Sequence, residues 1–257
     1  MLIATFNVNN VNRRLDNLTA WLGRRKPDVV CLQELKARHD DFPQGALADA
    51  GYESVWIGER SWNGVAILAR GREPVLTRHA LPGAPDDQQA RYVEAAVSGI
   101  LIASIYAPNG NPQPGPKFAY KLAWLERLRR HATRLRRTGA PVVLVGDFNV
   151  APTALDIYPT TSWDDDALVH PESRAAFRRL VGRNSVDALR TMHPDDQVYT
   201  FWSYQRNRWL RDAGLRLDHL LLSRNLAHRL KASEVDREER GLESASDHAP
   251  AWIRLDW

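Results

Sequence analysis

A chain of 257 residues, 44% of them hydrophobic, is long enough to bury a substantial core, which excludes a disordered protein. Its net charge of +4 is carried mainly by arginine, and this favours contact with a polyanion because guanidinium groups match phosphate oxygens. One cysteine excludes a disulfide framework, and no apolar run is long enough to span a membrane, so we expect an unprocessed, cytoplasmic protein without a membrane partner.

Strand-like segments run through the whole chain. Each combines apolar and β-branched or aromatic residues and is bounded by turn-forming residues. In chain order, the nine predicted strands are 2–8, 28–34, 64–69, 92–97, 100–107, 142–147, 198–204, 215–223 and 249–257.

Three segments between these strands have the periodicity of amphipathic helices. One has its apolar face at residues 15–22, the second at residues 118–128, and the third covers 170–184, with its start near Pro171. We find no shift in composition that would mark a domain boundary. Many strands with a few long helices predict a single mixed α/β domain, residues 1–257.

Polar side chains follow the strand predicted at 142–147. Asp147 and Asn149 lie two residues apart, and alternate side chains of a strand share a face, so both project the same way. Asp and Asn also form ordinary turns by bonding their own backbone. The alternative is a site where a carboxylate steers water and a neutral amide holds an anion. Spacing alone leaves both interpretations open.

Other strand ends carry similar residues. Asn7 and Asn9 follow the apolar run 2–6, Glu34 follows the run 28–32, and Tyr106 follows the run 100–105. Taken singly, each has an ordinary structural explanation, such as a turn or a core aromatic. Their shared position favours a functional site, because catalytic groups are often held on loops by a rigid scaffold.

Asp218 is unusual because it interrupts an apolar strand. An unpaired carboxylate there would cost several kcal/mol, so it needs a partner. Asp247 and His248, just before the last strand, are candidates to supply one, and Arg216 is a nearer alternative.

The order of these motifs resembles the exonuclease III group of apurinic/apyrimidinic endonucleases, within the endonuclease/exonuclease/phosphatase superfamily. The resemblance covers residues 2 to 256 and is carried by "TFNVNN", "DVVCLQELK", "NGVAIL", "SIYAPNG", "GDFNVAPTALDIY", "DDALVHPESR", "YTFWSY", "GLRLDHLLLS" and "SDHAP". The short "GDFN" recurs across the superfamily, whereas its extended form is more specific to the DNA-repair branch. The resemblance implies a four-layer αββα sandwich of two mixed β-sheets flanked by helices, with the site at one edge between the sheets.

The resemblance also implies a metal site. Glu34 is similar to the principal ligand of a Mg²⁺ ion, for which Mn²⁺ can substitute, and Asn7 and Asp247 help to arrange the metal or its waters. Asn9 replaces an aspartate found in some relatives, which leaves its part in metal or substrate binding open.

The remaining matched positions act on the phosphate. Asp147 matches the residue that orients and deprotonates the attacking water, and Asn149 matches the one that holds the scissile phosphate. Tyr106 and His248 correspond to donors to phosphate oxygens, with Asp218 hydrogen-bonded to His248.

The stretch 199–219 has the parts of a pocket for a baseless sugar. An abasic nucleotide flips out of the duplex with little unstacking cost and fits a pocket too small and apolar for a normal nucleotide. Phe201 lies where relatives place an aromatic wall, and Leu217 is expected beside it. Four arginines surround Trp209 on a loop that we expect to contact the DNA backbone: Arg206, Arg208, Arg211 and Arg216. The alternative is that the aromatics only pack and the arginines form a solvated turn.

The sequence therefore predicts a monomeric, Mg²⁺-dependent DNA-repair hydrolase. Its expected partner is double-stranded DNA with abasic sites, cut on their 5′ side, or with 3′ ends that lose nucleotides or phosphates. The alternatives are a phosphatase or diesterase of the same fold acting on a small phosphorylated molecule or lipid, and a non-catalytic DNA-binding module. The basic loop at 205–216 is evidence against the first, and the presence of Glu34, Asp147 and His248 is evidence against the second.

Overall fold

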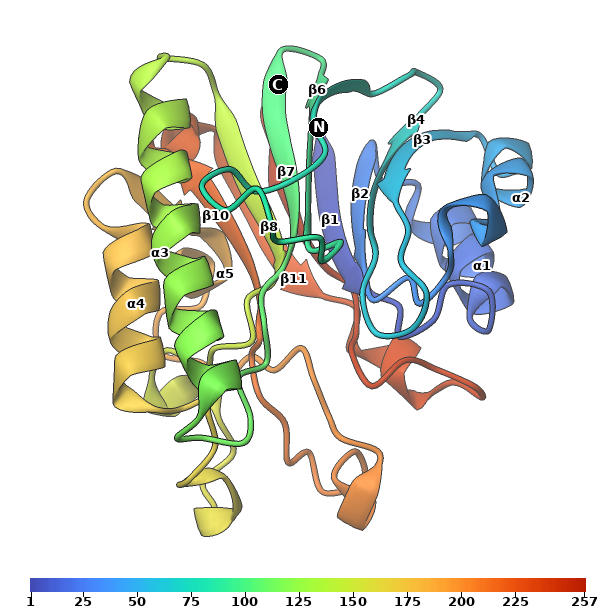
Figure 1. Ribbon diagram of the computed structural model, residues 1–257. Coiled ribbons are helices and arrows are strands. Elements are labelled where there is room, and N and C mark those ends of the chain that lie inside the picture. Colours follow the sequence, from blue (N-terminus) through green and yellow to red (C-terminus); the bar gives the residue numbers. More distant parts are fainter.

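Two six-stranded sheets face each other in the computed structural model, which describes residues 1–257 (Figure 1). The first sheet has the order β11-β12-β1-β2-β4-β3, and the second has the order β5-β6-β7-β8-β10-β9. The strands of the first sheet are β1 (Leu2–Asn7), β2 (Val29–Gln33), β3 (Tyr52–Ile57), β4 (Val65–Arg70), β11 (Leu230–Val235) and β12 (Ala251–Leu255). Those of the second are β5 (Val75–Arg78), β6 (Tyr92–Val97), β7 (Ile100–Tyr106), β8 (Val142–Asp147), β9 (Ser185–Asp187) and β10 (Asp218–Ser223).

Both sheets are mixed. Each contains one parallel pair, β1 with β2 and β7 with β8, among antiparallel neighbours. Parallel strands end at the same edge of their sheet, so the residues that follow β1, β2, β7 and β8 are brought together at one end of the sandwich.

Helices cover the outer faces of the sandwich (Figure 1). On the first sheet lie α1 (Leu15–Arg25) and α2 (Gln44–Asp49), and on the second lie α3 (Pro116–Arg137) and α4 (Pro171–Val181). The short α5 (Ala188–Met192) follows β9. The predicted four-layer α/β architecture is confirmed. None of the helices combines the length and the apolar character needed to cross a membrane.

Three apolar clusters separate the four layers. Val29, Ile102 and Val143 belong to the cluster between the two sheets. Trp124 and Phe177 belong to the cluster between the second sheet and its helices, and a similar cluster lies beneath α1 and α2. A core on both faces explains why the central strands are continuous apolar runs instead of alternating ones.

The three predicted helices are present as α1, α3 and α4. Pro27 and Pro141 lie just beyond the first two, and α4 begins with Pro171 in its first turn. The His170 side chain accepts a hydrogen bond from the Glu172 backbone N–H, which satisfies one of the free donors at the start of α4. The sequence patterns did not indicate α2 or α5, which are too short to show a clear period.

The strand predicted at 198–204 is wrong. Phe201 forms only isolated bridges, to Leu215 on one side and His248 on the other. Its neighbours Tyr199 and Trp202 both pack into one small cluster, so this segment lacks the alternating faces of a strand. Likewise, residues 215–217 precede β10 and are not part of it. Four strands were also missed because they are short or partly exposed: β3, β5, β9 and β11.

Candidate active site at the sheet edge

The end of β8 requires a glycine before its catalytic candidates. Gly146 has a φ of +146°, and a Cβ atom there would lie 1.9 Å from the Ile105 carbonyl oxygen on β7. This close approach of two backbones places Asp147 beside Tyr106 at the common edge. The strand composition and the glycine together therefore position both side chains.

Asp147 is the centre of the hydrogen-bond network at this edge. Its Oδ2 accepts from Asn7 Nδ2 at 3.0 Å, and its Oδ1 accepts from the Asn149 backbone N–H at 2.8 Å. Burial, together with the negative charges of Asp218 and Glu34, raises the pKa of Asp147 to about 7. Asp147 is therefore a buried carboxyl group suited to taking up a proton near neutral pH.

Asn149 turns back over this carboxylate. Its backbone lies in the left-handed region, with a φ of +51°. Its Nδ2 donates to the Ala107 carbonyl oxygen at 2.9 Å and lies 3.3 Å from Asp147 Oδ2. Asn109 Nδ2 lies 3.4 Å from Asn149 Oδ1. Asn149 thus forms a turn, which was one explanation of its place in the sequence. The same turn brings a neutral amide to the sheet edge, as the other explanation, a binding site, requires.

His248 pairs with Asp218, as the sequence predicted. The His248 Nδ1 to Asp218 Oδ2 distance is 2.7 Å, and His248 Nε2 lies 3.8 Å from Asp147 Oδ2. Burial disfavours the charged imidazolium, but the neighbouring carboxylates of Asp218, Asp147 and Asp247 outweigh it and raise the pKa of His248 to about 10. His248 is therefore held as a charged donor facing Asp147.

Glu34 brings another carboxylate to the edge. It accepts from Asn7 Nδ2 at 2.9 Å and forms an ion pair of 2.8 Å with Lys36. Burial alone would raise the pKa of Glu34, but the charge of Lys36 and the hydrogen bond from Asn7 lower it. Glu34 therefore stays ionised, and one ligand atom each from Glu34, Asp147 and His248 lie within 4.8 Å of one another.

The other candidates surround this centre. Asn9 Nδ2 donates to Asp247 Oδ1 at 2.9 Å, and Asn9 Oδ1 accepts from Lys36 at 2.6 Å. Burial and the charges of Glu34 and Asp147 raise the pKa of Tyr106 well above its usual value, so its phenol remains a proton donor.

The donor atoms fit a hard divalent cation. Two of the three side chains whose ligand atoms meet here, Glu34 and Asp147, offer carboxylate oxygens, which are ligands that Mg²⁺ prefers. Asp218 Oδ1 is buried without a hydrogen-bond partner, so negative charge at this edge is not fully compensated by the protein itself.

An apolar wall adjoins the network. The Phe201 ring lies 4.9 Å from the His248 ring, and Phe201 packs against the cluster that contains Leu168, Leu215 and the buried Leu217. The structure thus brings Phe201 and Leu217 together beside the catalytic candidates.

The basic loop at 205–216 presents fewer of its side chains to solvent than the sequence predicted. Trp209 packs edge-on against Trp202, with ring centroids 5.1 Å apart, and Arg240 lies over its ring. Arg206 and Arg211 are exposed, but Arg208 is buried over the Trp163 ring. Leu210, at 81% exposure, is the most exposed large apolar side chain.

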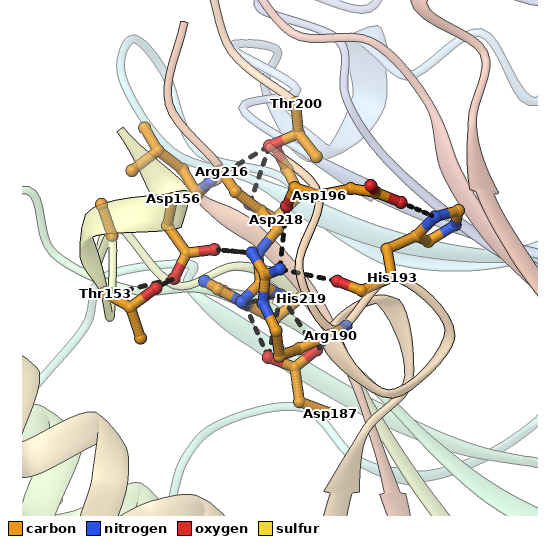
Figure 2. Close-up of polar contacts among 12 residues, drawn as sticks. Thr153, Asp156, Asp187, Arg190, His193, Asp196, Thr200, Arg216, Asp218 and His219 are labelled. Atoms are coloured by element: carbon orange, nitrogen blue, oxygen red, sulfur yellow. Dashed lines mark hydrogen bonds and ion pairs between the residues drawn. The ribbon is translucent and has the colours of Figure 1, made fainter. Parts of the chain in front are cut away.

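Arg216 was predicted to contact the DNA backbone from this loop, but its side chain is buried within the protein. Its side chain is only 1% exposed, and it donates to Asp156 Oδ1 at 2.7 Å and to Asp187 Oδ2 at 2.8 Å (Figure 2). It also donates to His219 Nδ1 at 3.0 Å, while Arg190 donates to the same Asp156 oxygen. The guanidinium therefore binds two carboxylates inside the protein and is not available to DNA. Both carboxylates come from segments far from Arg216 in the sequence.

Two residues of the site were missed by the sequence analysis. Lys36 contacts both Glu34 and Asn9, and Lys121 lies beneath the loop of Asn149. Lys121 could have been found as the one charged side chain on the apolar face of the helix predicted near residues 118–128. Lys36 had no such signal, because it follows Glu34 by two residues in an ordinary polar turn.

Comparison with known proteins agrees with this geometry. A model described as the Endonuclease/Exonuclease/phosphatase family matches residues 4–248. Exodeoxyribonuclease III of Haemophilus influenzae is 29% identical over 267 residues, covering 99% of this chain and 100% of that protein. The structure of an AP endonuclease from Archaeoglobus fulgidus matches at a TM-score of 0.95 with 34% identity, and that of the 3′ phosphatase NExo from Neisseria, bound to a product DNA hairpin, at 0.94 with 39% identity. Both matches cover 100% of each chain. The chain therefore belongs to the Endonuclease/Exonuclease/phosphatase family, and its predicted membership of the exonuclease III group of AP endonucleases, which are hydrolases of phosphodiester bonds, is confirmed.

Proposed function

We propose that this protein is a Mg²⁺-dependent DNA-repair phosphodiesterase that cuts duplex DNA 5′ to an abasic site and leaves a 3′ hydroxyl. At 3′ ends, the same site removes nucleotides or phosphates. The observation that carries the proposal is the buried Asp147, with a raised pKa, facing the charged His248 across 3.8 Å. A base and a cationic donor at this spacing suit the attack of water on a phosphate, in which positioning and charge neutralisation dominate.

In this mechanism, Asp147 orients the attacking water and accepts its proton. The Asn7 amide and the Asn149 backbone N–H hold the two oxygens of Asp147 in place. The Asn149 side chain binds a phosphate oxygen without adding charge. Tyr106 and His248 donate to other phosphate oxygens, and Asp218 keeps the imidazole charged and oriented.

Glu34 is the proposed principal ligand of the metal, with Asn7 and Asp247 arranging the metal or its waters and Asn9 orienting Asp247. When bound, Mg²⁺ supplies positive charge that stabilises the leaving 3′ oxygen, and Mn²⁺ is expected to substitute. The close approach of ligand atoms from Glu34, Asp147 and His248, within 4.8 Å of one another, supports the assignment.

Phe201 and Leu217 are the proposed walls of the pocket for the baseless sugar. Their place at the same small apolar cluster and the position of Phe201 against His248 support this assignment. Trp209 supports the basic loop from within through Trp202, and the exposed Arg206 and Arg211 are left to contact the DNA backbone. We assign Arg216 a structural part beneath this pocket.

The relatives named as an exodeoxyribonuclease, an AP endonuclease and a DNA-bound 3′ phosphatase support DNA as the partner. We expect the protein to act as a monomer on intracellular DNA. A phosphatase of small phosphorylated molecules is the alternative on the same fold, and the apolar wall beside the network favours the abasic sugar instead.

The test is incubation with a duplex that carries one stable abasic analogue, in Mg²⁺ or in EDTA. We expect a single cut 5′ to the analogue with Mg²⁺ and none with EDTA, and an undamaged duplex serves as the control. A second duplex with a 3′ phosphate measures trimming. If Mg²⁺ supports neither incision nor trimming, the proposed function is wrong.

A further inference from the structure

Lys121 lies on α3 and is fully buried, at 0% exposure. The chain has only five lysines, and the other four are at least partly exposed. A buried ammonium is costly unless its donors are satisfied and its charge is balanced. Lys121 therefore needs an explanation that ordinary packing does not provide.

The three donors of this ammonium are all used on backbone oxygens. Lys121 Nζ lies 2.6 Å from the Asn149 carbonyl oxygen, 2.9 Å from that of Asn109 and 3.2 Å from that of Ala167. The Asn109 carbonyl belongs to the connection between β7 and α3, and those of Asn149 and Ala167 belong to the two ends of the connection between β8 and α4. One side chain thus ties two connections together, and both ends of the longer one, at the edge that carries the catalytic candidates.

The contact with Asn149 fixes the residue assigned to the phosphate. The Asn149 N–H is held by Asp147 Oδ1, and its carbonyl is held by Lys121, so both of its peptide groups are fixed. This residue is in the left-handed region, which an asparagine adopts at some cost, so such fixing determines where its amide points. Asn109, whose amide faces Asn149 Oδ1, is held by the same ammonium.

The charge of Lys121 has no ion-pair partner. No carboxylate oxygen lies within ion-pair distance of its Nζ, and the nearby negative charges are those of Asp147 and Asp166. Burial lowers the pKa of Lys121 to about 7, although both of these carboxylates oppose the shift. The three carbonyls solvate the ammonium but carry no net charge to balance it, and one of them belongs to Asn149, the residue assigned to the phosphate.

We propose that Lys121 is a positioning residue for phosphodiester hydrolysis: it aligns the Asn109 and Asn149 loops, and its buried charge is balanced by the bound phosphate. This proposal deepens the proposed function and rests on it, because it takes Asn149 as the residue that holds the phosphate. Lys121 does not touch the substrate and acts through the two asparagines.

The first test compares K121M, K121R and K117M. Methionine keeps the volume but removes the charge and the donors, arginine keeps the charge, and Lys117 is exposed one turn earlier on the same helix. We expect the single-turnover rate of pre-bound K121M to fall roughly 10- to 100-fold, in the range caused by small misplacements at a reacting centre. DNA affinity in EDTA should fall far less than the rate, because linkage limits this loss to the change in the pKa of Lys121 on binding. K121R should recover part of the rate, and K117M should match the wild type.

A K121M rate equal to that of the wild type would overturn the proposal, as would a rate loss matched by a proportional loss of folded protein. If the wild type itself neither cuts nor trims DNA, the proposed function fails, whatever the behaviour of K121M. The two failures are therefore distinguishable.

A second measurement needs no folded K121M. With ¹³Cε-labelled lysine, the five lysine signals of the wild type can be titrated by NMR, and the Lys121 signal is the one absent from K121R. We expect the pKa of Lys121 to rise when abasic duplex is bound in EDTA, because the phosphate stabilises the ammonium. An unchanged pKa in the bound state would overturn the claim that the phosphate balances this charge.

Discussion

Two buried charged clusters meet at the start of β10, and they differ in charge balance. The arginine cluster, defined as Asp156, Asp187, Arg190, Arg216 and His219, pairs each carboxylate with a guanidinium (Figure 2). The catalytic cluster contains two cations, His248 and Lys36. It contains four carboxylates: Glu34, Asp147, Asp218 and Asp247. Arg216 and Asp218 are only two residues apart.

The pKa shifts reflect this difference. In the arginine cluster, Arg216 overcomes the effect of burial and holds the pKa values of Asp156 and Asp187 below their usual value, so both stay ionised. In the catalytic cluster, burial raises the pKa of Asp147. The balanced arginine cluster is suited to stabilising the fold, whereas the excess of carboxylates in the catalytic cluster suits the proposed metal and proton transfer.

The largest expected effect is on catalysis in Asp147→Asn. Removing the base should lower the single-turnover incision rate by at least ~10²-fold, the usual range for loss of general-base catalysis. The fold and DNA binding should persist, because a buried carboxylate with a raised pKa does not stabilise the folded state near neutral pH. Near-normal turnover of this variant would remove Asp147 from the mechanism.

The matching change in the arginine cluster is Arg216→Met, and its effect should be on stability. Breaking a buried ion pair by removing one partner costs about 3–5 kcal/mol, because Asp156 and Asp187 lose their counter-charge. Denaturant unfolding measures this loss, and Arg206→Met on the exposed loop is the control, with an expected change within about 0.5 kcal/mol. Unchanged stability would mean that the two clusters do not differ as described.

Glu34→Ala should change the metal dependence of the reaction. Without this carboxylate, the Mg²⁺ concentration that gives half-maximal rate should rise, because the metal loses its principal proposed ligand. Titration of the incision rate with Mg²⁺ checks this. If the titration curve is the same as for the wild type, the metal is held elsewhere.

Asp218→Asn should change the pH dependence of the rate. The pKa of His248 in the folded protein, about 10, lies above its ordinary value of 6.5, so the stabilisation from its carboxylate neighbours is complete below pH 6.5 and is lost as pH rises to about 10. Removing the Asp218 charge lowers this pKa, so the alkaline fall in rate should begin at lower pH. An alkaline limb that does not move would show that His248 is not the donor lost there.

The smallest effect is expected for Phe201→Ala, which changes selectivity. The ring lies beside His248 but makes no bond to the phosphate network, so the fold should survive. The ratio of rates on an abasic duplex and on an undamaged 3′ end should fall. Equal losses on both substrates, or a lower melting temperature alone, would mean that Phe201 only packs.

Asp218 and Arg216 also differ in how well their contacts could be predicted from the sequence. Asp218 could be predicted to need a partner because an acid in an apolar strand is costly, and the partner proved to be His248. Arg216 was assigned to the basic loop because of its neighbours in sequence. Its real partners, Asp156 and Asp187, lie 60 and 29 residues away and gave no local signal.

In the fold, too, the elements with a local sequence signal could be predicted, and those that depend on distant residues could not. The central strands were predictable, because burial on both faces makes them continuous apolar runs. The exposed strand β5 and the segment around Phe201 could not be predicted, because their conformation depends on pairing with residues that are distant in the sequence. The organisation as one domain, the roles of the site residues and the monomeric state remain predictions.

In the proposed mechanism, the residues at the edge of the sandwich direct a water molecule to the phosphorus atom. The direct measurement is one round of incision of an abasic-analogue duplex in H₂¹⁸O with Mg²⁺, followed by mass spectrometry of both product strands. We predict one ¹⁸O atom in the new 5′ phosphate and an unlabelled 3′ hydroxyl, because water attacks phosphorus and the P–O3′ bond breaks. Label in the 3′ hydroxyl, or no label in either product, would show that the enzyme does not cut by attack of water on phosphorus with breakage of the P–O3′ bond.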